Sequence, residues 1–152
     1  MDPLTHLQER VEAWLGTLGI ESPEGRLPVV RSEQALIVPS CFLHGDAGYV
    51  RLTALLFTDV EPSLPLLYRL LAMNNAALLG AFRLFEDRTL VYSATLPART
   101  LDADTFAEAL QHVAAAADTA WQELRPMAGG RSATLLTRPS DGRPTPEPPC
   151  SR

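Results

Sequence analysis

The side chains that most often carry chemistry are few in this 152-residue chain, and they are widely separated in the sequence. The three histidines, His6, His44 and His112, fall in a predicted helix, a turn and another helix, without the short spacings of zinc-binding motifs. Cys41 lies in a predicted strand and lacks the companion signature of a catalytic nucleophile, so we expect a small buried hydrophobe. The sequence therefore predicts no catalytic residue, no metal site and no cofactor.

Three other polar stretches have structural explanations. The turn Gly45–Gly48 is too short and too acidic for a phosphate-binding loop. Asp102 and Asp104 stand at the start of a helical pattern, where capping and the helix dipole explain both carboxylates. Asn74 and Asn75, the only asparagines, come at the end of another helical pattern, where helix termination and local hydrogen bonds explain them.

Composition and charge narrow the classes of partner. The chain is 46% hydrophobic and 20% charged with a net charge of −5, which is typical of a globular protein. Residues 1–125 hold nine Arg against sixteen Asp and Glu, and residues 126–152 hold four Arg against two. Because nucleic-acid binding needs a basic face, we expect no direct contact with nucleic acid. An acidic body is compatible with basic protein partners.

Targeting signals and disulfide patterns are not evident. The N-terminus is not basic and precedes no apolar core, and no run approaches the roughly 20 apolar residues of a membrane span. We therefore expect a cytoplasmic protein without a membrane partner. Cys41 and Cys150 fall in a predicted strand and a predicted tail, so a structural disulfide is not expected.

Apolar periodicity predicts three helices, over residues 3–18, 63–74 and 102–125. The second begins with Ser63 as a cap and carries apolar residues almost all the way round, so it must be buried on more than one side. In so short a chain, one of these sides is expected to face a second copy of the protein. Pro126 is expected to end the third helix.

Alternating residues predict an antiparallel sheet. Strands are expected over residues 27–33, 35–43 and 49–58, followed by a hairpin between Gly80 and Pro97. The prolines in the first two strands suggest edge positions. One face of the sheet is apolar. The second face still carries apolar residues, namely Leu55, Phe57, Phe85 and Val91, which are covered either by the chain itself or by a partner.

The predicted fold is α+β, in the order α-β-β-β-α-β-β-α, with an antiparallel sheet packed by helices. Residues 1–126 form this domain. Residues 127–152 hold five of the thirteen prolines and are expected to be a disordered tail. Within that tail, residues 134–137 form a short apolar stretch that is able to adopt an extended conformation.

From about Leu64 to Leu124 the sequence resembles the YbjN-like family, which shares the fold of class I type III secretion chaperones. The matching features are a Leu-rich helix ending at Asn75, the stretch Gly80–Leu84, the strand end Ala94–Pro97, the helix start Leu101-Asp102, and Ala117-Asp118 ahead of Trp121. This resemblance implies a small acidic homodimer that pairs through its central helix and the adjoining strand. It also implies that non-globular segments of a client protein are held on apolar patches.

Two sets of residues follow as hypotheses for these contacts. The expected dimer interface consists of Leu67, Leu70, Leu71, Phe82 and Leu84. The expected client-binding residues are Trp14, Val29, Val38, Phe42, Leu55 and Phe57, beside an edge strand over residues 27–33 to which an extended peptide can add.

The leading interpretation is a non-enzymatic, dimeric, chaperone-like adaptor for a partner protein. The alternative is a small-molecule-binding or regulatory sensor domain that uses the groove between sheet and helices. An open, shallow apolar groove along the sheet would favour the adaptor, and a deep closed pocket with converging polar groups would favour the sensor. An enzyme is the least favoured class because no cluster of polar residues resembles an active site.

Overall fold

The computed structural model describes residues 2–23 and 26–134, which form one α+β unit around an antiparallel sheet. The elements in chain order are α1 (Pro3–Thr17), β1 (Val30–Arg31), β2 (Leu36–His44), β3 (Ala47–Thr58), α2 (Leu64–Ala76), β4 (Ala81–Leu84), β5 (Leu90–Pro97), a 3₁₀ turn (Ala98–Thr100), α3 (Ala103–Ala128) and β6 (Arg131–Ser132). The predicted fold class and element order are confirmed. The 3₁₀ turn and β6 were not predicted.

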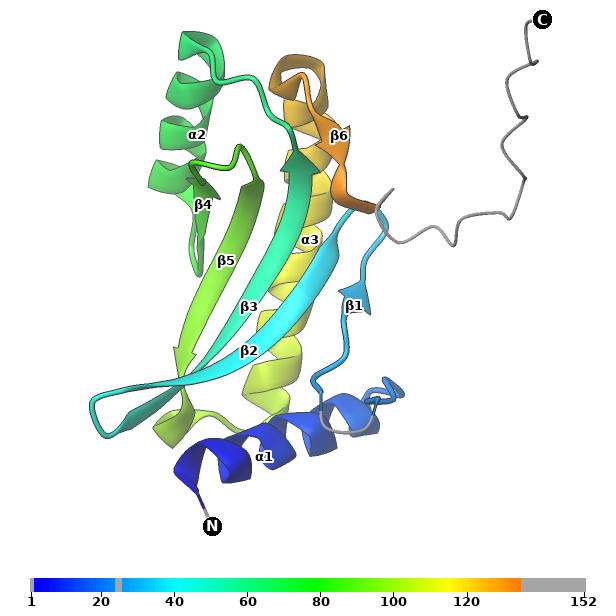
Figure 1. The fold of residues 1–152 in the computed structure, drawn as a ribbon, viewed down its shortest axis with the longest axis vertical. Helices are drawn as coiled ribbons and strands as arrows, with labels where there is room; N and C mark the ends of the chain where they lie inside the picture. Colours follow the sequence, from blue (N-terminus) through cyan, green and yellow to red (C-terminus); the bar gives the residue numbers. More distant parts are fainter. Residues whose placement is uncertain (1, 24–25, 135–152) are drawn as a thin grey trace, which may run out of the picture.

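The sheet has the strand order β1-β2-β3-β5-β4, and β6 pairs with the end of β3. All of its pairings in the described residues are antiparallel. Figure 1 shows α3 running behind the long strands and α1 lying across the lower end of the molecule. The helix α2 contacts both α3 and β4, so it extends the helical layer to the β4 edge.

The core lies between the sheet and α3. Val50, Leu52, Ala54 and Leu56 of β3 all face α3 and are fully buried, as their alternation predicts. The predicted apolar stripe of α3 is buried along its whole length, namely Phe106, Ala109, Leu110, Val113, Ala117, Ala120, Trp121 and Leu124. Small alanines within this stripe allow α3 to lie close to the sheet.

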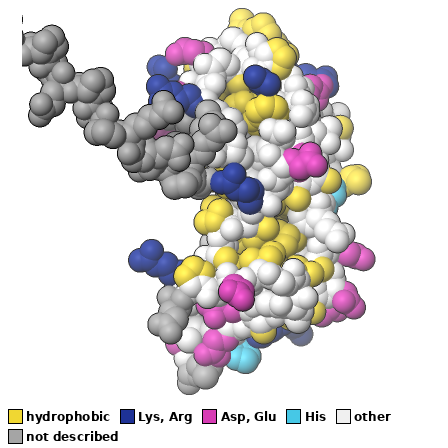
Figure 2. All heavy atoms as spheres, turned by 90° about the vertical axis from the view of Figure 1, so that its right-hand side faces the viewer, with side chains coloured by type: hydrophobic (Ala, Val, Ile, Leu, Met, Phe, Trp, Pro, Cys, Tyr) yellow, Lys and Arg dark blue, Asp and Glu magenta, His cyan; other side chains and the backbone are white. Residues whose placement is uncertain are grey.

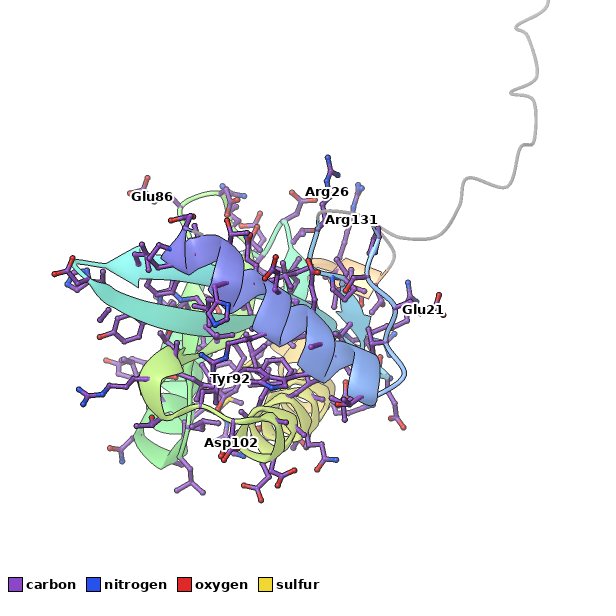
Figure 3. The ribbon with its side chains drawn as sticks, turned by 90° about the horizontal axis from the view of Figure 1, so that it is seen from below. Glu21, Arg26, Glu86, Tyr92, Asp102 and Arg131 are labelled. Atoms are coloured by element: carbon purple, nitrogen blue, oxygen red, sulfur yellow. The ribbon has the colours of Figure 1, made fainter. Side chains whose placement is uncertain are left out.

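The helix starts follow the predicted capping residues. The Ser63 side chain accepts a hydrogen bond from the Leu66 N–H (3.3 Å), and Asp102 accepts one from the Thr105 N–H (2.8 Å). The bond from the Thr105 N–H lowers the pKa of the Asp102 carboxyl, which lies at the surface where α3 begins (Figure 3).

The predicted end of the last helix is wrong. Pro126 lies inside α3, which continues to Ala128 and ends at Gly129 in the left-handed conformation. A proline so near the C-terminus removes one intrahelical bond, and its cost is offset because the Ala128 side chain is buried beyond it. The folded body thus continues past residue 126 to at least Thr134, and residues 135–152 lie outside the described residues.

The C-terminal part of the body is anchored by Trp121. Its indole Nε1 donates to the Ser132 hydroxyl (3.2 Å), and its ring stacks on Phe57 with 5.9 Å between centroids. Ser132 in turn pairs with Phe57 in the sheet. One aromatic side chain therefore joins α3, β3 and β6.

The two outer edges of the sheet differ. At the β4 edge, the Asn74 amide of α2 bonds both backbone groups of Phe82: its Nδ2 donates to the carbonyl (3.0 Å) and its Oδ1 accepts from the N–H (2.6 Å). At the other edge, β1 pairs with only the first two residues of β2. The rest of β2, from Val38 to His44, pairs with β3 on one side and has no strand on its outer side among the described residues. Pro39 lies on this free edge, as its missing N–H suggests.

Candidate functional site

The face of the sheet turned away from α2 and α3 is the main candidate site, and we name it the open face. Figure 1 looks onto it, and no helix crosses β2, β3 and β5 on this side. The strand register arranges its side chains in four rows across the sheet: Leu36–Leu55–Val91, Val38–Thr53–Ser93, Ser40–Arg51–Thr95 and Phe42–Tyr49–Pro97. The open face therefore has an aromatic row at one end and an apolar row at the other, in which Leu36 and Val91 are buried and Leu55 is half-buried.

The Arg51 row lies between the row that begins at Val38 and the aromatic row, and it has a defined geometry. The Arg51 guanidinium lies over the Phe42 ring at 4.7 Å from its centroid, and its Nε donates to the Thr95 hydroxyl (3.0 Å). The Phe42 ring stacks in turn on Tyr49, with 5.6 Å between centroids. These contacts fix the plane of the guanidinium, and the sequence alone gave no reason to select Arg51.

Three of the predicted client-binding residues come together on the open face. Val38, Phe42 and Leu55 are all half-buried there, because β2 and β3 pair in a register that turns them to the same side. Val38 and Phe42 also lie on the free edge of β2. An extended segment added to this edge would contact both of these side chains.

The other three predicted client-binding residues lie elsewhere. Phe57 is only 2% exposed and packs on Trp121, because a bulge between Leu55 and Phe57 turns it toward α3. Placing Phe57 on the second face was therefore wrong. Trp14 packs on Phe106 of α3, with 5.4 Å between ring centroids, so it does not join Val38 and Phe42 in one groove.

Val29 is exposed just before β1, and β1 lies on the right-hand side of Figure 1, the side that Figure 2 faces. Hydrophobic side chains form a band across the middle of that side, with several acidic side chains below it. Since β1 covers only residues 30–31, the predicted edge strand over residues 27–33 is much shorter than expected. The free edge of the sheet is on β2 instead.

The predicted dimer residues separate into two groups. Leu70 and Phe82 are 7% and 8% exposed, so they belong to the core of the chain and are not available as an interface. Leu71 is 67% exposed, Leu67 is also exposed, and Leu84 is half-buried. Further exposed apolar residues of the same region, which were not predicted, are Leu64, Tyr68 and Leu78. The outer side of α2 is therefore apolar and uncovered.

A cleft of 420 Å³ lies between α2 and α3, over Phe82 and Tyr92. Its polar groups bond one another: Arg69 pairs with Glu123, and the buried Tyr92 hydroxyl lies 3.3 Å from Nε2 of His112. Burial raises the pKa of Tyr92. The polar groups of this cleft are thus already engaged with each other, which disfavours a small-molecule site.

A wider cleft of 750 Å³ lies between α1, the β2–β3 turn and the end of β5. Its ionisable lining residues are His6, Arg10, His44, Asp46, Tyr49 and Arg99. Arg10 is held there by the Leu101 carbonyl (2.9 Å) and by the Trp14 ring. Sequence reasoning treated His6 and His44 as isolated, because only the packing of α1 on the hairpin brings them to one cleft.

No metal-binding cluster of three or more His, Cys, Asp or Glu side chains occurs among the described residues. None of the helices in that part of the chain is long and apolar enough to cross a membrane.

Cys41 is expected to react slowly in the folded protein. Burial, reinforced by the nearby Glu12 carboxylate, raises the pKa of the Cys41 thiol to about 11. Because the thiolate is the reacting form, roughly 100-fold less of it is present at pH 8 than for a thiol of pKa 9.0. In a Cys150→Ser background, labelling by iodoacetamide should be slow in buffer and should rise about tenfold per pH unit toward pH 11. Equally fast labelling in buffer and in urea would contradict this assignment.

Comparison with known proteins adds a family and a fold. Residues 5–135 match the family model TY-Chap1, described as type III secretion system (YopN, CesT) and YbjN peptide-binding chaperone 1. The search of curated proteins gave no match. The chain is similar to a structure of the ExsC–ExsE complex, with a TM-score of 0.54 and 17% identity over 80% of this chain and 96% of that one. It is also similar to YbjN from E. coli, with a TM-score of 0.51 and 21% identity over 78% and 91% of the two chains.

Proposed function

Because this chain belongs to the family of type III secretion and YbjN peptide-binding chaperones, we propose that it is a non-enzymatic adaptor that holds an extended segment of a partner protein on its open face. One observation carries the proposal. Val38 and Phe42 lie on a face that no helix covers, and the same residues form a free strand edge. The β2 edge therefore offers a partner segment both backbone groups for strand pairing and apolar side chains for contact.

Strand addition explains how such a surface binds segments of differing sequence. Backbone hydrogen bonds along the β2 edge supply affinity that is independent of sequence, and alternate side chains of the added segment face the rows of the open face. An exposed edge would otherwise be a site of aggregation. Pro39 interrupts the donors on this edge, which limits pairing with unselected strands.

We place a second copy of the chain on the outer side of α2. Leu64, Tyr68 and Leu71 follow one another at spacings of four and three residues, so they share one side of the helix. Exposed apolar side chains grouped in this way are typical of association surfaces. A homodimer paired there leaves the open face and the β2 edge free, since both lie on the other side of the sheet.

A small-molecule sensor is the less supported function. In the cleft between α2 and α3, the polar groups already pair with one another and are not free to bind a ligand. The half-buried apolar side chains Val38, Phe42 and Leu55 on the open face support an adaptor instead.

The proposal is tested by changing Val38 or Phe42 to aspartate. A charge at either position should abolish the capture of peptides from a displayed random library, because the carboxylate would be desolvated against an apolar segment. Melting temperature and dimer mass should stay near those of the unchanged protein, since both side chains are only half-buried.

Leu18→Asp serves as the matched control, because Leu18 is an exposed leucine at the end of α1, away from the open face. Peptide capture that persists in the Val38 and Phe42 variants would overturn the assignment. Unfolding of both variants would show that these residues belong to the core.

A further inference from the structure

Acidic and basic side chains are distributed unevenly over the sheet. The four longer strands, β2, β3, β4 and β5, contain no Asp or Glu, although the chain holds 18 of these residues. The same strands contain two arginines, Arg51 and Arg83. By strand alternation both of them face the open side, since Arg51 pairs with Thr95 and Arg83 with Val91. The open face is therefore cationic within an acidic protein.

Arg51 is held ready for a carboxylate. A guanidinium has five N–H donors, and within the part of the chain that the structure describes only the Nε donor of Arg51 is used, by Thr95. Stacking on Phe42 keeps the terminal nitrogens in a fixed plane. Planar, fixed guanidinium groups with free terminal nitrogens favour bidentate bonds to carboxylates.

The neighbourhood of Arg51 leaves room for such a group. Ser40 stands between Arg51 and the free edge of β2, and its side chain is small and exposed. A carboxylate on a segment added to the edge beside Ser40 can thus reach across to the guanidinium. In the next row, the Ser93 hydroxyl is 95% buried on the same side and has no hydrogen-bond partner among the described residues. This row therefore also contains an unsatisfied polar group.

We propose that the open face selects partner segments with an Asp or Glu opposite Arg51 and an apolar residue two positions away on each side. This spacing of two positions follows from the side-chain rows of the open face. Beside Ser40 on the edge are Phe42 in one direction and Val38 in the other, each two residues away. Because the two neighbours are both apolar, the selected pattern is the same whether the segment runs parallel or antiparallel to β2. This inference rests on the proposed function and names the chemistry of its partner.

The test uses a displayed library of random peptides selected on the full chain. The unchanged protein should enrich peptides with an acidic residue flanked at two positions on each side by apolar residues. In the best peptide, replacing the acid by its amide should weaken binding about tenfold or more, as expected for a hydrogen-bonded charge pair. Arg51→Gln should bind both peptides equally, at the weaker affinity. Arg83→Gln, which changes the other arginine of the same face, should keep the preference for the acid.

The possible results distinguish a failure of this inference from a failure of the proposed adaptor function. Enrichment of peptides without an acidic position, or an acid preference that survives Arg51→Gln, would overturn this inference and leave the adaptor function standing. No enrichment at all would overturn both. A second copy of the chain on the open face would also overturn it, and light scattering would show this as a loss of dimer in Phe42→Asp.

Discussion

Replacing Leu71 with arginine should convert the proposed dimer into folded monomers, whereas the same replacement at Leu70 should unfold the protein. Leu71 is 67% exposed on the outer side of α2, and Leu70 is 7% exposed in the core. At Leu71 the new charge would be buried only in the dimer, where an unpaired charge costs about 3–5 kcal/mol. At Leu70 the new charge would be buried in the core of each chain, whether or not the chain forms a dimer.

Light scattering and circular dichroism together distinguish these results. The Leu71→Arg protein should have the mass of a single chain and an intact helical spectrum, and Leu70→Arg should lose both solubility and the cooperative melt. Leu18→Arg, at an exposed leucine of α1, should remain dimeric. An unchanged chain that is already monomeric at high micromolar concentration would exclude the α2 interface.

Trp121→Ala should cause a large loss of stability in a chain that still folds. Truncation of a buried tryptophan costs about 3–5 kcal/mol, and here it removes the Phe57 stack as well as the bond to Ser132. At about 2–4 °C for each kcal/mol, the melting temperature should fall by roughly 6–20 °C. The measurement is thermal unfolding followed by circular dichroism.

Trp121→Phe is the matched variant. It keeps a ring against Phe57 and loses the indole donor, so it should cost about 1 kcal/mol for the hydrogen bond in addition to the smaller ring. A similar loss in both variants would mean that the Ser132 bond, and not the aromatic packing, anchors the C-terminal part of the body.

The features predicted correctly are those set by residues close in sequence. The stripe of α3 and the alternation of β3 depend on spacings of three, four and two residues, which a single chain displays directly. The caps Ser63 and Asp102 act on N–H groups three residues away, so they too could be predicted. Which side of α2 faces the core could not, because apolar residues occur nearly all round the helix.

The missed features depend on contacts between distant segments. Phe57 was placed on the wrong face because a bulge breaks the alternation of β3, and the sequence gives no sign of it. The pairing of β6 with the end of β3 involves two residues only, too few for a pattern. The role of Arg51 depends on the register that sets it beside Phe42 and Thr95. Register is a property of the paired strands, so one strand alone does not reveal it.

The bond between Asn74 and Phe82 has a consequence for the size of any assembly. A side-chain amide bonds the backbone groups that a further strand would need at the β4 edge, so the sheet can lengthen only beyond β2. Endless polymerisation by strand pairing requires two open ends on every molecule. A molecule with one open end can form only closed complexes, either with one added strand or with a single copy of itself across a two-fold axis. The Asn74 side chain thus limits how many chains can join through their sheets, and it prevents the growth of fibres by strand pairing.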